Sequence, residues 1–273
     1  HILFLGCVFF TFSCKFNEKK STNNFDAAMA DSLSYDLFSI DTTDASCTTK
    51  SKNCPTIKIE YPIFNTKDSS LNVYLNNEVL KSILYISDTS SYASIQDIIT
   101  SYFKENKDDR ASKKDEFYYA WQISNEIKVH AKIGNYITLE KYNEIYEGGA
   151  HPNSSIFYDV YDITNRKKIN LEDVLNIQDT ALLRIGEHYF RKDNSISDTS
   201  TLADAMYFIF GDGEDFEDSK NYGKFHFNNN FAFTKDGIEF LYNTYEIAPY
   251  AVGAPSIVIP YSKIKPFLKI TIW

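Results

Sequence analysis

The feature that most limits the fold is a change of hydrophobic period near residue 117, where apolar and polar residues begin to alternate. Between residues 121 and 133 apolar side chains recur at nearly every second position, which is typical of a strand with one buried face. A slip at Ser124-Asn125 predicts a β-bulge. Gly134-Asn135 is a favoured hairpin turn, so Tyr136–Tyr146 is the predicted returning strand. The chain is therefore expected to contain a long antiparallel hairpin.

Further strands and helices flank this hairpin. Residues 57–61 alternate like a strand, whereas residues 71–80 and 95–103 carry apolar side chains at helical spacing. Ser69 or Ser70 is placed to cap the first of these helices.

The C-terminal half repeats this mixture. A strand pattern follows residue 153, Asn170 and Asp179 each precede a helical segment, and Asp236-Gly237 marks a hairpin between two strands. Strands and helices do not alternate regularly, so we predict an α+β fold made of two units with antiparallel sheets packed by helices. The expected units are residues 47–150 and 151–273.

The N-terminal segment indicates export. Residues 1–14 are apolar, fewer than the roughly 20 residues of a membrane-spanning helix, and are typical of a signal peptide. Thr11-Phe12-Ser13-Cys14 resembles a bacterial lipobox, which implies lipidation of Cys14. An ordinary secretory signal is the alternative. The polar residues 15–46 predict a flexible tether, and Lys15 favours sorting to the outer membrane. We therefore expect an envelope lipoprotein that faces the periplasm or exterior and touches the membrane only through its anchor.

Two cysteines remain for the folded part. Cys47 and Cys54 enclose a short polar loop, and in an oxidising envelope we expect them to form a disulfide. Such a bridge stabilises by roughly 2.5 kcal/mol in the chain-entropy model. A metal pair is the alternative, although the spacing does not fit a zinc knuckle.

Composition excludes some partners. The chain of 273 residues has a net charge of -9 and no long run of Lys and Arg, so nucleic acid is not an expected partner. The acidic stretch at residues 211–218 lacks the ligand spacing of a calcium-binding loop. We therefore predict no metal and no cofactor.

The stretch YEGGAHPN, residues 146–153, makes strict demands on the backbone. Its two glycines permit positive φ, and Pro152 holds His151 extended, so the motif predicts a strand-to-strand turn that His151 pins by a backbone hydrogen bond. A ligand-binding role is the second interpretation. The residues concerned are Tyr146, Glu147, Gly148, Gly149, His151 and Asn153.

A second stretch, YEIAPYAVG, combines aromatic side chains with a proline. Such a surface could stack on a sugar or seat a peptide, or it could simply pack against the sheet. The candidate binding residues are Tyr245, Glu246, Pro249 and Tyr250. The binding interpretation gains weight if both stretches lie on one edge of the molecule.

Catalysis lacks a complete set of residues. His151 could act as a base oriented by Glu147, but no nucleophile motif accompanies it. The position of His130 in the alternating strand pattern predicts a histidine on the sheet surface. We therefore assign no catalytic residue. A hydrolase of cell-wall glycan or its acyl groups, and an envelope assembly scaffold, stay as alternatives to a binding protein.

Three stretches, YEGGAHPN, INLEDVL and the segment from Asp236 to Lys265, are together similar to a bacterial envelope domain pair of unknown function. That pair forms the extracellular part of lysozyme-sensing anti-sigma factors and precedes the catalytic domain of some peptidoglycan deacetylases. The resemblance covers residues 55–273 and implies a deacetylase-associated N-terminal unit and a C-terminal α+β unit. It implies a peptidoglycan fragment or a lysozyme-like protein as the partner.

Overall fold

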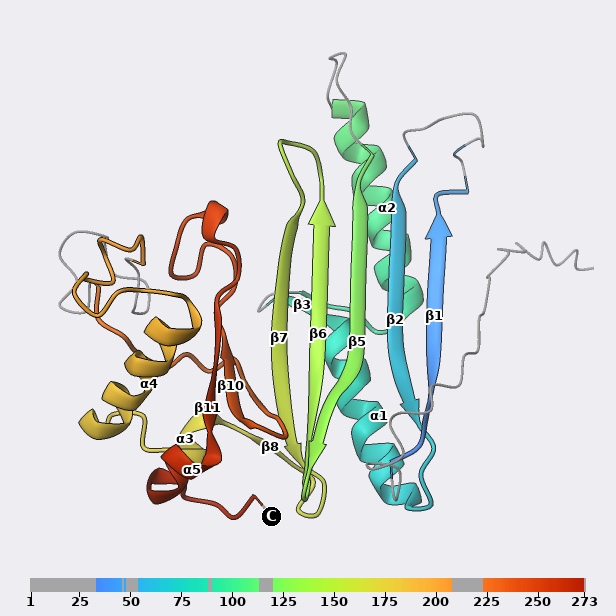
Figure 1. The fold of residues 1–273 in the computed structure, drawn as a ribbon. Coiled ribbons are helices and arrows are strands. Elements are labelled where there is room, and N and C mark those ends of the chain that lie inside the picture. The colour runs from blue at the N-terminus through green and yellow to red at the C-terminus, as the bar shows by residue number, and fades with distance from the viewer. Residues whose placement is uncertain are drawn as a thin grey trace, which may run out of the picture.

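The computed structural model describes residues 33–45, 47, 54–87, 90–112, 120–207 and 223–272. The predicted signal peptide with Cys14 and the acidic stretch at residues 211–218 lie outside these ranges. The described residues form two main sheets with helices on their outer faces, so the predicted α+β class is confirmed (Figure 1).

The larger sheet has six strands in the order β1-β2-β5-β6-β7-β8. Its strands are β1 Tyr35–Thr43, β2 Thr56–Phe64, β5 Gln122–Ile133, β6 Tyr136–Tyr146, β7 Asn153–Asp162 and β8 Lys167–Ile169. All neighbours are antiparallel except β2 and β5, which run parallel. A parallel pair needs a long crossover, here supplied by helices α1 Ser69–Leu84 and α2 Ile95–Ser112, with the short strands β3 Tyr85–Ser87 and β4 Ser90–Ser91 between them.

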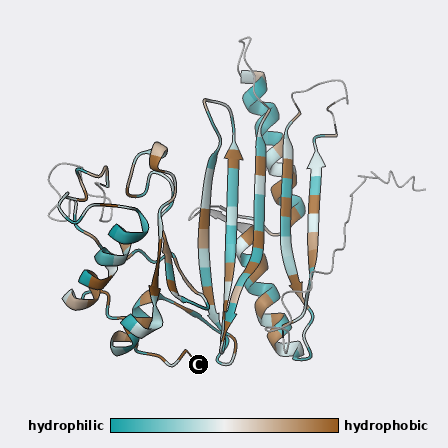
Figure 2. Cartoon of the chain, in the orientation of Figure 1, coloured by the Kyte–Doolittle hydropathy of each residue, from teal (hydrophilic) through white to brown (hydrophobic). Residues whose placement is uncertain are grey.

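Helices α1 and α2 cover one face of this sheet. Leu75 of α1 and Ile99 of α2 share a core with alternate residues of the strands, such as Ile59 and Ile127. Figure 2 shows the matching alternation of hydrophobic and hydrophilic positions along the long strands. The predicted hairpin at Gly134-Asn135 is confirmed, because β5 and β6 pair on either side of it.

The smaller sheet has the order β11-β10-β9 and lies against the opposite face, where β9 contacts β5, β6 and β7. Helix α4 packs on its far side, with Phe190 in one aromatic core with Phe233 and Phe240. The strands are β9 Phe231–Phe233, β10 Gly237–Leu241 and β11 Ser256–Pro260. The remaining elements are α3 Leu171–Val174, α4 Thr180–Asp193, α5 Tyr261–Ile264 and the 3-10 turns η1 Tyr250–Val252 and η2 Lys265–Phe267.

The folded part begins earlier than the sequence predicts. Strand β1 lies inside the stretch assigned to a tether, and Ile40 packs into the core opposite Ile59. The apolar alternation of this strand is short, but the strand pairs with β2 along its whole length. In addition, β7 and β8 follow the expected unit boundary at residue 150 and yet extend the sheet of the first unit.

Two local details also differ from the sequence predictions. The bulge of β5 lies between Val129 and Ala131 rather than at Ser124-Asn125. Helix α1 is capped by Asp68 instead of Ser69 or Ser70, since Asp68 Oδ1 accepts hydrogen bonds from the backbone N–H groups of Ser70 and Leu71, both at 3.0 Å.

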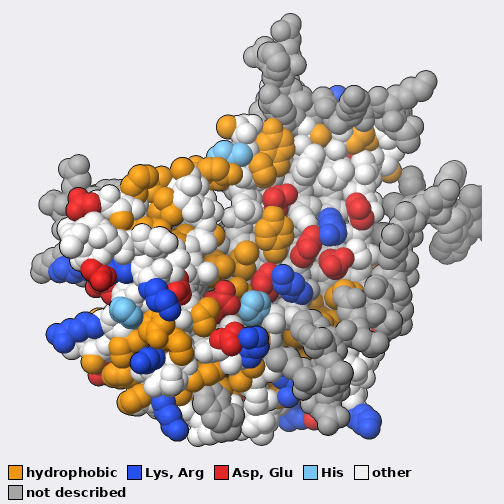
Figure 3. Space-filling view, viewed as in Figure 1, with side chains coloured by type: hydrophobic (Ala, Val, Ile, Leu, Met, Phe, Trp, Pro, Cys, Tyr) orange, Lys and Arg blue, Asp and Glu red, His pale blue; other side chains and the backbone are white. Residues whose placement is uncertain are grey.

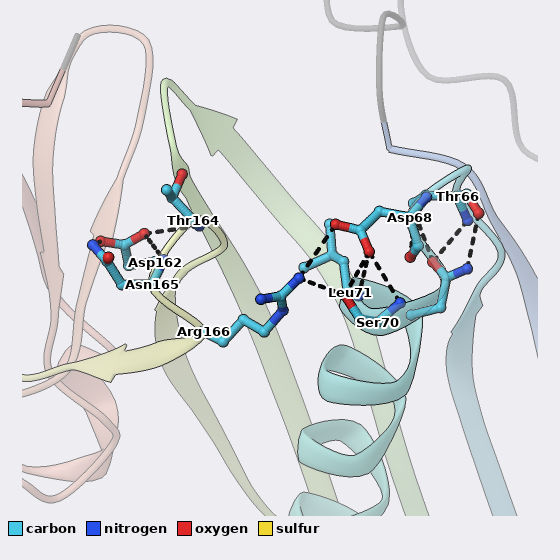
Figure 4. A network of polar contacts seen from close by, with 9 residues as sticks. Thr66, Asp68, Ser70, Leu71, Asp162, Thr164, Asn165 and Arg166 are labelled. Carbon is cyan, nitrogen blue, oxygen red and sulfur yellow. Dashed lines mark hydrogen bonds and ion pairs between the residues drawn. The ribbon is translucent and has the colours of Figure 1, made fainter.

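The cap of α1 is tied to the far edge of the same sheet (Figure 4). Arg166, in the turn between β7 and β8, donates to Ser70 Oγ at 2.5 Å and pairs with Asp68 Oδ2 at 3.4 Å. Hydrogen bonds from Leu71 and Ser70 hold the pKa of Asp68 below its ordinary value. The turn is closed by Asp162, whose Oδ1 accepts from the backbone N–H of Thr164.

The predicted disulfide is confirmed. Cys47 and Cys54 are bonded, with their Cα atoms 5.8 Å apart. The bridge closes the connection between β1 and β2, so it restrains the edge strand that the N-terminal segment enters.

Candidate functional site

The stretch YEGGAHPN forms the connection between β6 and β7. Gly148 and Gly149 have φ of 105° and 106°, which side chains with a Cβ rarely adopt. The hydroxyl of Tyr146 donates to the Gly149 carbonyl at 3.1 Å, and His151 Nδ1 lies 2.9 Å from the Pro152 carbonyl. The motif therefore has the backbone geometry that its glycines predict, and its histidine binds the backbone.

A loop from a distant part of the sequence meets this turn. The ring of Tyr250, in η1, stacks on His151 with centroids 4.0 Å apart and an interplanar angle of 20°. Tyr245 packs against Tyr250 at 5.5 Å. We call these three side chains the aromatic ladder. The two sequence-predicted stretches thus lie side by side, and the loop of η1 stands next to the hairpin (Figure 1).

The aromatic ladder is open to solvent. Tyr245 and Tyr250 are 54% and 46% exposed, high values for large aromatic side chains. Figure 3 shows hydrophobic side chains gathered in the upper half of this face, beside a histidine. Exposed, contiguous aromatic surface is more typical of a contact site than of packing.

The loop that carries Tyr245 is fixed to the edge of β7. Asn243 Oδ1 accepts from the backbone N–H of Ile156 at 2.7 Å, and its Nδ2 donates to the Ile156 carbonyl at 3.0 Å. Asn230 Oδ1 accepts from the N–H of Tyr158 at 2.8 Å. Side-chain amides thus replace a neighbouring strand on this stretch of β7, which protects the edge and positions the loop.

Other candidate residues have different surroundings. Glu246 points into the loop, where it accepts from Asn228 Nδ2 at 2.8 Å and from the Asn243 N–H at 2.6 Å, so it positions the loop. Glu147 is exposed, and the hydrogen bond of His151 goes to Pro152 rather than to Glu147. Pro249 immediately precedes η1, and Asn153 begins β7. A base oriented by Glu147 therefore has no support in this geometry.

His130 is not a sheet-surface histidine as its sequence pattern predicted. Its Nδ1 lies 2.9 Å from Glu140 Oε2, and its Nε2 lies 3.3 Å from Glu239 Oε2 on β10. Burial disfavours the charged ring, but the hydrogen bonds to both carboxylates outweigh it and raise the pKa of His130 to about 9. The resulting imidazolium bridges the two main sheets.

The surroundings of His130 complete a charged cluster. Lys128 pairs with Glu140 at 2.7 Å, and the ring of Tyr158 packs on His130 at 4.7 Å. Acidic, basic and histidine side chains lie together near the centre of this face (Figure 3). Within the described ranges, no group of three or more His, Cys, Asp or Glu side chains is placed to hold a metal ion. We assign the cluster to holding the sheets together.

The fold and the site define an α+β chain with an exposed aromatic surface, and family models match two parts of its sequence. Residues 48–154 match the family model of deacetylase PdaC, and residues 176–262 match that of a protein of unknown function, DUF3298. The resemblance to a domain pair of unknown function, a deacetylase-associated unit followed by a C-terminal α+β unit, is therefore confirmed.

Two solved structures share the fold. A DUF3298-family protein from Bacteroides fragilis NCTC 9343 has a TM-score of 0.68 and 22% identity, over 86% of this chain and 93% of that chain. A DUF3298-family protein from Pseudomonas aeruginosa PAO1 has a TM-score of 0.66 and 19% identity, over 88% of this chain and 95% of that chain. At such identities the likeness shows the fold alone. No curated protein matches the sequence.

No helix in the described part of the chain has both the length and the apolar character to cross a bilayer.

Proposed function

We propose that this chain is a non-catalytic binding module of the bacterial cell envelope, and that the aromatic ladder is its contact surface for cell-wall glycan. The observation that carries the proposal is the stacking of His151 on Tyr250, with Tyr245 beside them. Tyrosine rings present flat apolar faces with a polar tip, which suits the apolar face and hydroxyl rim of a sugar ring.

The rigidity of the loop supports this assignment. Tyr245 has φ of 68°, a conformation that is unusual for a bulky residue and is often found at functional sites. The hydrogen bonds of Asn243 and Glu246 fix the loop within the protein. A surface organised in advance loses less conformational entropy on binding.

The envelope location rests on three features of the chain. The matches to the envelope domain pair, the Cys47–Cys54 disulfide and the lipobox-like Thr11–Cys14 all favour a protein outside the cytoplasm. We propose that lipid on Cys14 anchors the module to a membrane and that the segment after it lets the folded part reach the wall.

Binding is tested with insoluble peptidoglycan and, by calorimetry, with neutral N-acetylglucosamine oligomers. We expect the wild-type chain to bind both and Tyr250→Ala to weaken binding at least about tenfold, since loss of a central aromatic contact removes on the order of 1.4 kcal/mol or more. The matched control is Val73→Ala on α1, because Val73 is 61% exposed and lies on the opposite side of the sheet.

Three outcomes oppose the proposal. Wild-type protein that stays in solution with peptidoglycan removes the glycan claim, as does equal binding by wild type and Tyr250→Ala. If the chain binds lysozyme through Tyr250 but binds no glycan, the ladder is a protein-docking surface and the ligand named here is wrong.

A further inference from the structure

A second candidate site is a cleft of about 950 Å³ beside β7. Its lining comes from both halves of the chain, including β6, β7, β8 and residues 224–230, and contains none of the three ladder side chains. A volume of this size falls in the range of small-molecule sites, roughly 300 to 1,000 Å³.

One wall of the cleft contains two lysines joined through a buried carboxylate. Lys141 Nζ lies 2.8 Å from Asp159 Oδ2, and Lys168 Nζ lies 2.7 Å from Asp159 Oδ1. Asp159 is only 5% exposed. Burial opposes its charge, but the two lysines outweigh this and hold the pKa of Asp159 below its ordinary value. Two ammonium groups thus share one carboxylate, which leaves an excess positive charge and further N–H donors.

Over the whole lining the charges balance, because Lys141, Lys168 and Lys224 are matched in number by Asp159, Glu172 and Glu246, but the charges are not evenly placed. Lys224 adds a third ammonium group from an exposed position. Glu246 is already hydrogen-bonded to Asn228 and Asn243, so its oxygens are engaged within the wall. Glu172 is an exposed carboxylate. Two of the three carboxylates, Asp159 and Glu246, are thus engaged within the wall, and the lysines supply the cationic N–H donors of the cleft.

An exposed aromatic ring adjoins the lysines. Phe157 lies directly opposite Lys141 in the pairing of β6 with β7 and two residues before Asp159, so all three share one face of the sheet. Phe157 is 43% exposed. An apolar ring face beside two cations complements a ligand that has a flat ring with an anionic substituent, and the exposed amides of Gln178 and Asn229 can bind its hydroxyl groups.

We propose that this cleft binds an acidic saccharide, with its carboxylate or phosphate on Lys141 and Lys168 and its sugar ring on Phe157. The site is separate from the aromatic ladder and adds an anion-recognising function to the module. It gives a role to each residue: Asp159 orients the two lysines, and Phe157, on the same face of the sheet, forms the platform.

The proposal is tested by calorimetric titration of the full chain with glucuronate, glucose 6-phosphate, glucose and inorganic phosphate. We expect one or both sugar acids to bind, and glucose to bind at least about tenfold more weakly. The comparison of glucuronate with glucose 6-phosphate distinguishes a carboxylate ligand from a phosphate ligand. If neither acid binds, or if glucose binds equally well, the proposal is wrong.

Substitutions locate the site. Lys168→Gln should weaken binding of the acid at least about tenfold, while Asp159 keeps Lys141 as its partner. Lys224→Gln is the second variant, since it removes a cleft charge from an exposed position. The matched control is Lys128→Gln, because Lys128 also pairs with a buried carboxylate, at 2.7 Å, on a neighbouring strand. An equal loss in the control, or no loss in either cleft variant, overturns the assignment.

The proposed contact of the sugar ring with Phe157 is tested by comparing the affinities for a sugar acid and for inorganic phosphate. Phe157→Ala should weaken the binding of the sugar acid and leave the affinity for inorganic phosphate unchanged. If both affinities fall together, or if only inorganic phosphate binds the wild-type chain, the saccharide part of the proposal fails. Since the calorimetric test of the ladder uses neutral N-acetylglucosamine oligomers, whereas peptidoglycan also carries carboxylates, that arm lets either site fail its test without the other.

Discussion

Tyr245 is held in a left-handed backbone conformation, with φ of 68°, although more than half of its side chain is exposed. Such a conformation costs about 1 kcal/mol or more for a residue with a Cβ. Because the ring gains little from burial, its stability contribution does not explain the strain. The strain is better explained by the position that it gives the ring beside Tyr250.

The substitution Tyr245→Gly tests this explanation. Glycine adopts positive φ without a steric penalty, so the free energy of unfolding should rise by about 0.5 to 1 kcal/mol while glycan binding weakens. Urea denaturation and the peptidoglycan pull-down measure the two effects. A less stable Tyr245→Gly variant would mean that the ring is a packing residue.

The ion pairs of His130 should make the free energy of unfolding depend on pH. Its folded pKa of about 9 exceeds the ordinary value of 6.5, so its stabilisation is fully present below pH 6.5 and is lost as the pH rises through about 9. The free energy of unfolding should therefore fall by roughly 2 kcal/mol between pH 6.5 and pH 9.5. Urea titrations at the two pH values measure this.

The variant His130→Gln isolates the contribution. It should be less stable than wild type at pH 6.5, and most of the loss of stability between the two pH values should disappear. The groups that face His130 are Glu140, Glu239, Lys128 and Tyr158, and the first two carry the shift. An unchanged pH dependence in the variant would assign the effect to other groups.

At the scale of elements, the sequence predicts where a hairpin lies, but it does not show why a particular residue is required there. The hairpin at Asp236-Gly237 is confirmed, since β9 pairs with β10 around it. Gly237, however, does not have positive φ, so turn geometry does not require it. A Cβ on Gly237 would lie 2.1 Å from the carbonyl oxygen of Ile259 on β11. The glycine is therefore needed for a close approach of strands.

Gly237→Ala should consequently lower the free energy of unfolding by about 1 to 3 kcal/mol, because the clash is with backbone and the sheet must shift. Asp236→Ala is the matched control in the same turn and should change stability by less than about 0.5 kcal/mol. Thermal or urea unfolding separates them. Equal stability of the two variants would show that β10 and β11 adjust freely.

Elements with regular periodicity were predictable and those defined by distant contacts were not. The helix after Asp179 and the strand pair around Gly134-Asn135 follow from local patterns, and both are present. The role of His130 was missed because Glu239 lies 109 residues away in sequence. The amides that protect β7 were also missed, although the run of asparagines at residues 228–230 was a signal.

At the scale of the whole molecule, the meeting of residues 146–153 with the loop around Tyr250 could not be derived from the sequence. Both stretches were candidates, but no local pattern gives the distance between them. It depends on how the smaller sheet packs on the larger one through β9 and the His130 bridge. The fold class, in contrast, follows from local periodicity alone and is confirmed.

The proposed anchor predicts a localisation result. Cys14→Ala should move the protein from the membrane fraction to the soluble fraction of the envelope, because two or more acyl chains are needed for stable anchoring. Cell fractionation with immunodetection measures this, with Cys7→Ala as the matched control. Retention of Cys14→Ala in the membrane fraction would contradict lipidation at that position.

The central claim is that the aromatic ladder binds cell-wall glycan. Its most direct test is an NMR titration of the isotope-labelled chain with a neutral, soluble N-acetylglucosamine oligomer. We predict that the largest shift changes map to His151, Tyr245 and Tyr250 and to the adjoining glycines Gly149 and Gly253. Shift changes confined to other residues, or none at saturating fragment, would contradict the claim.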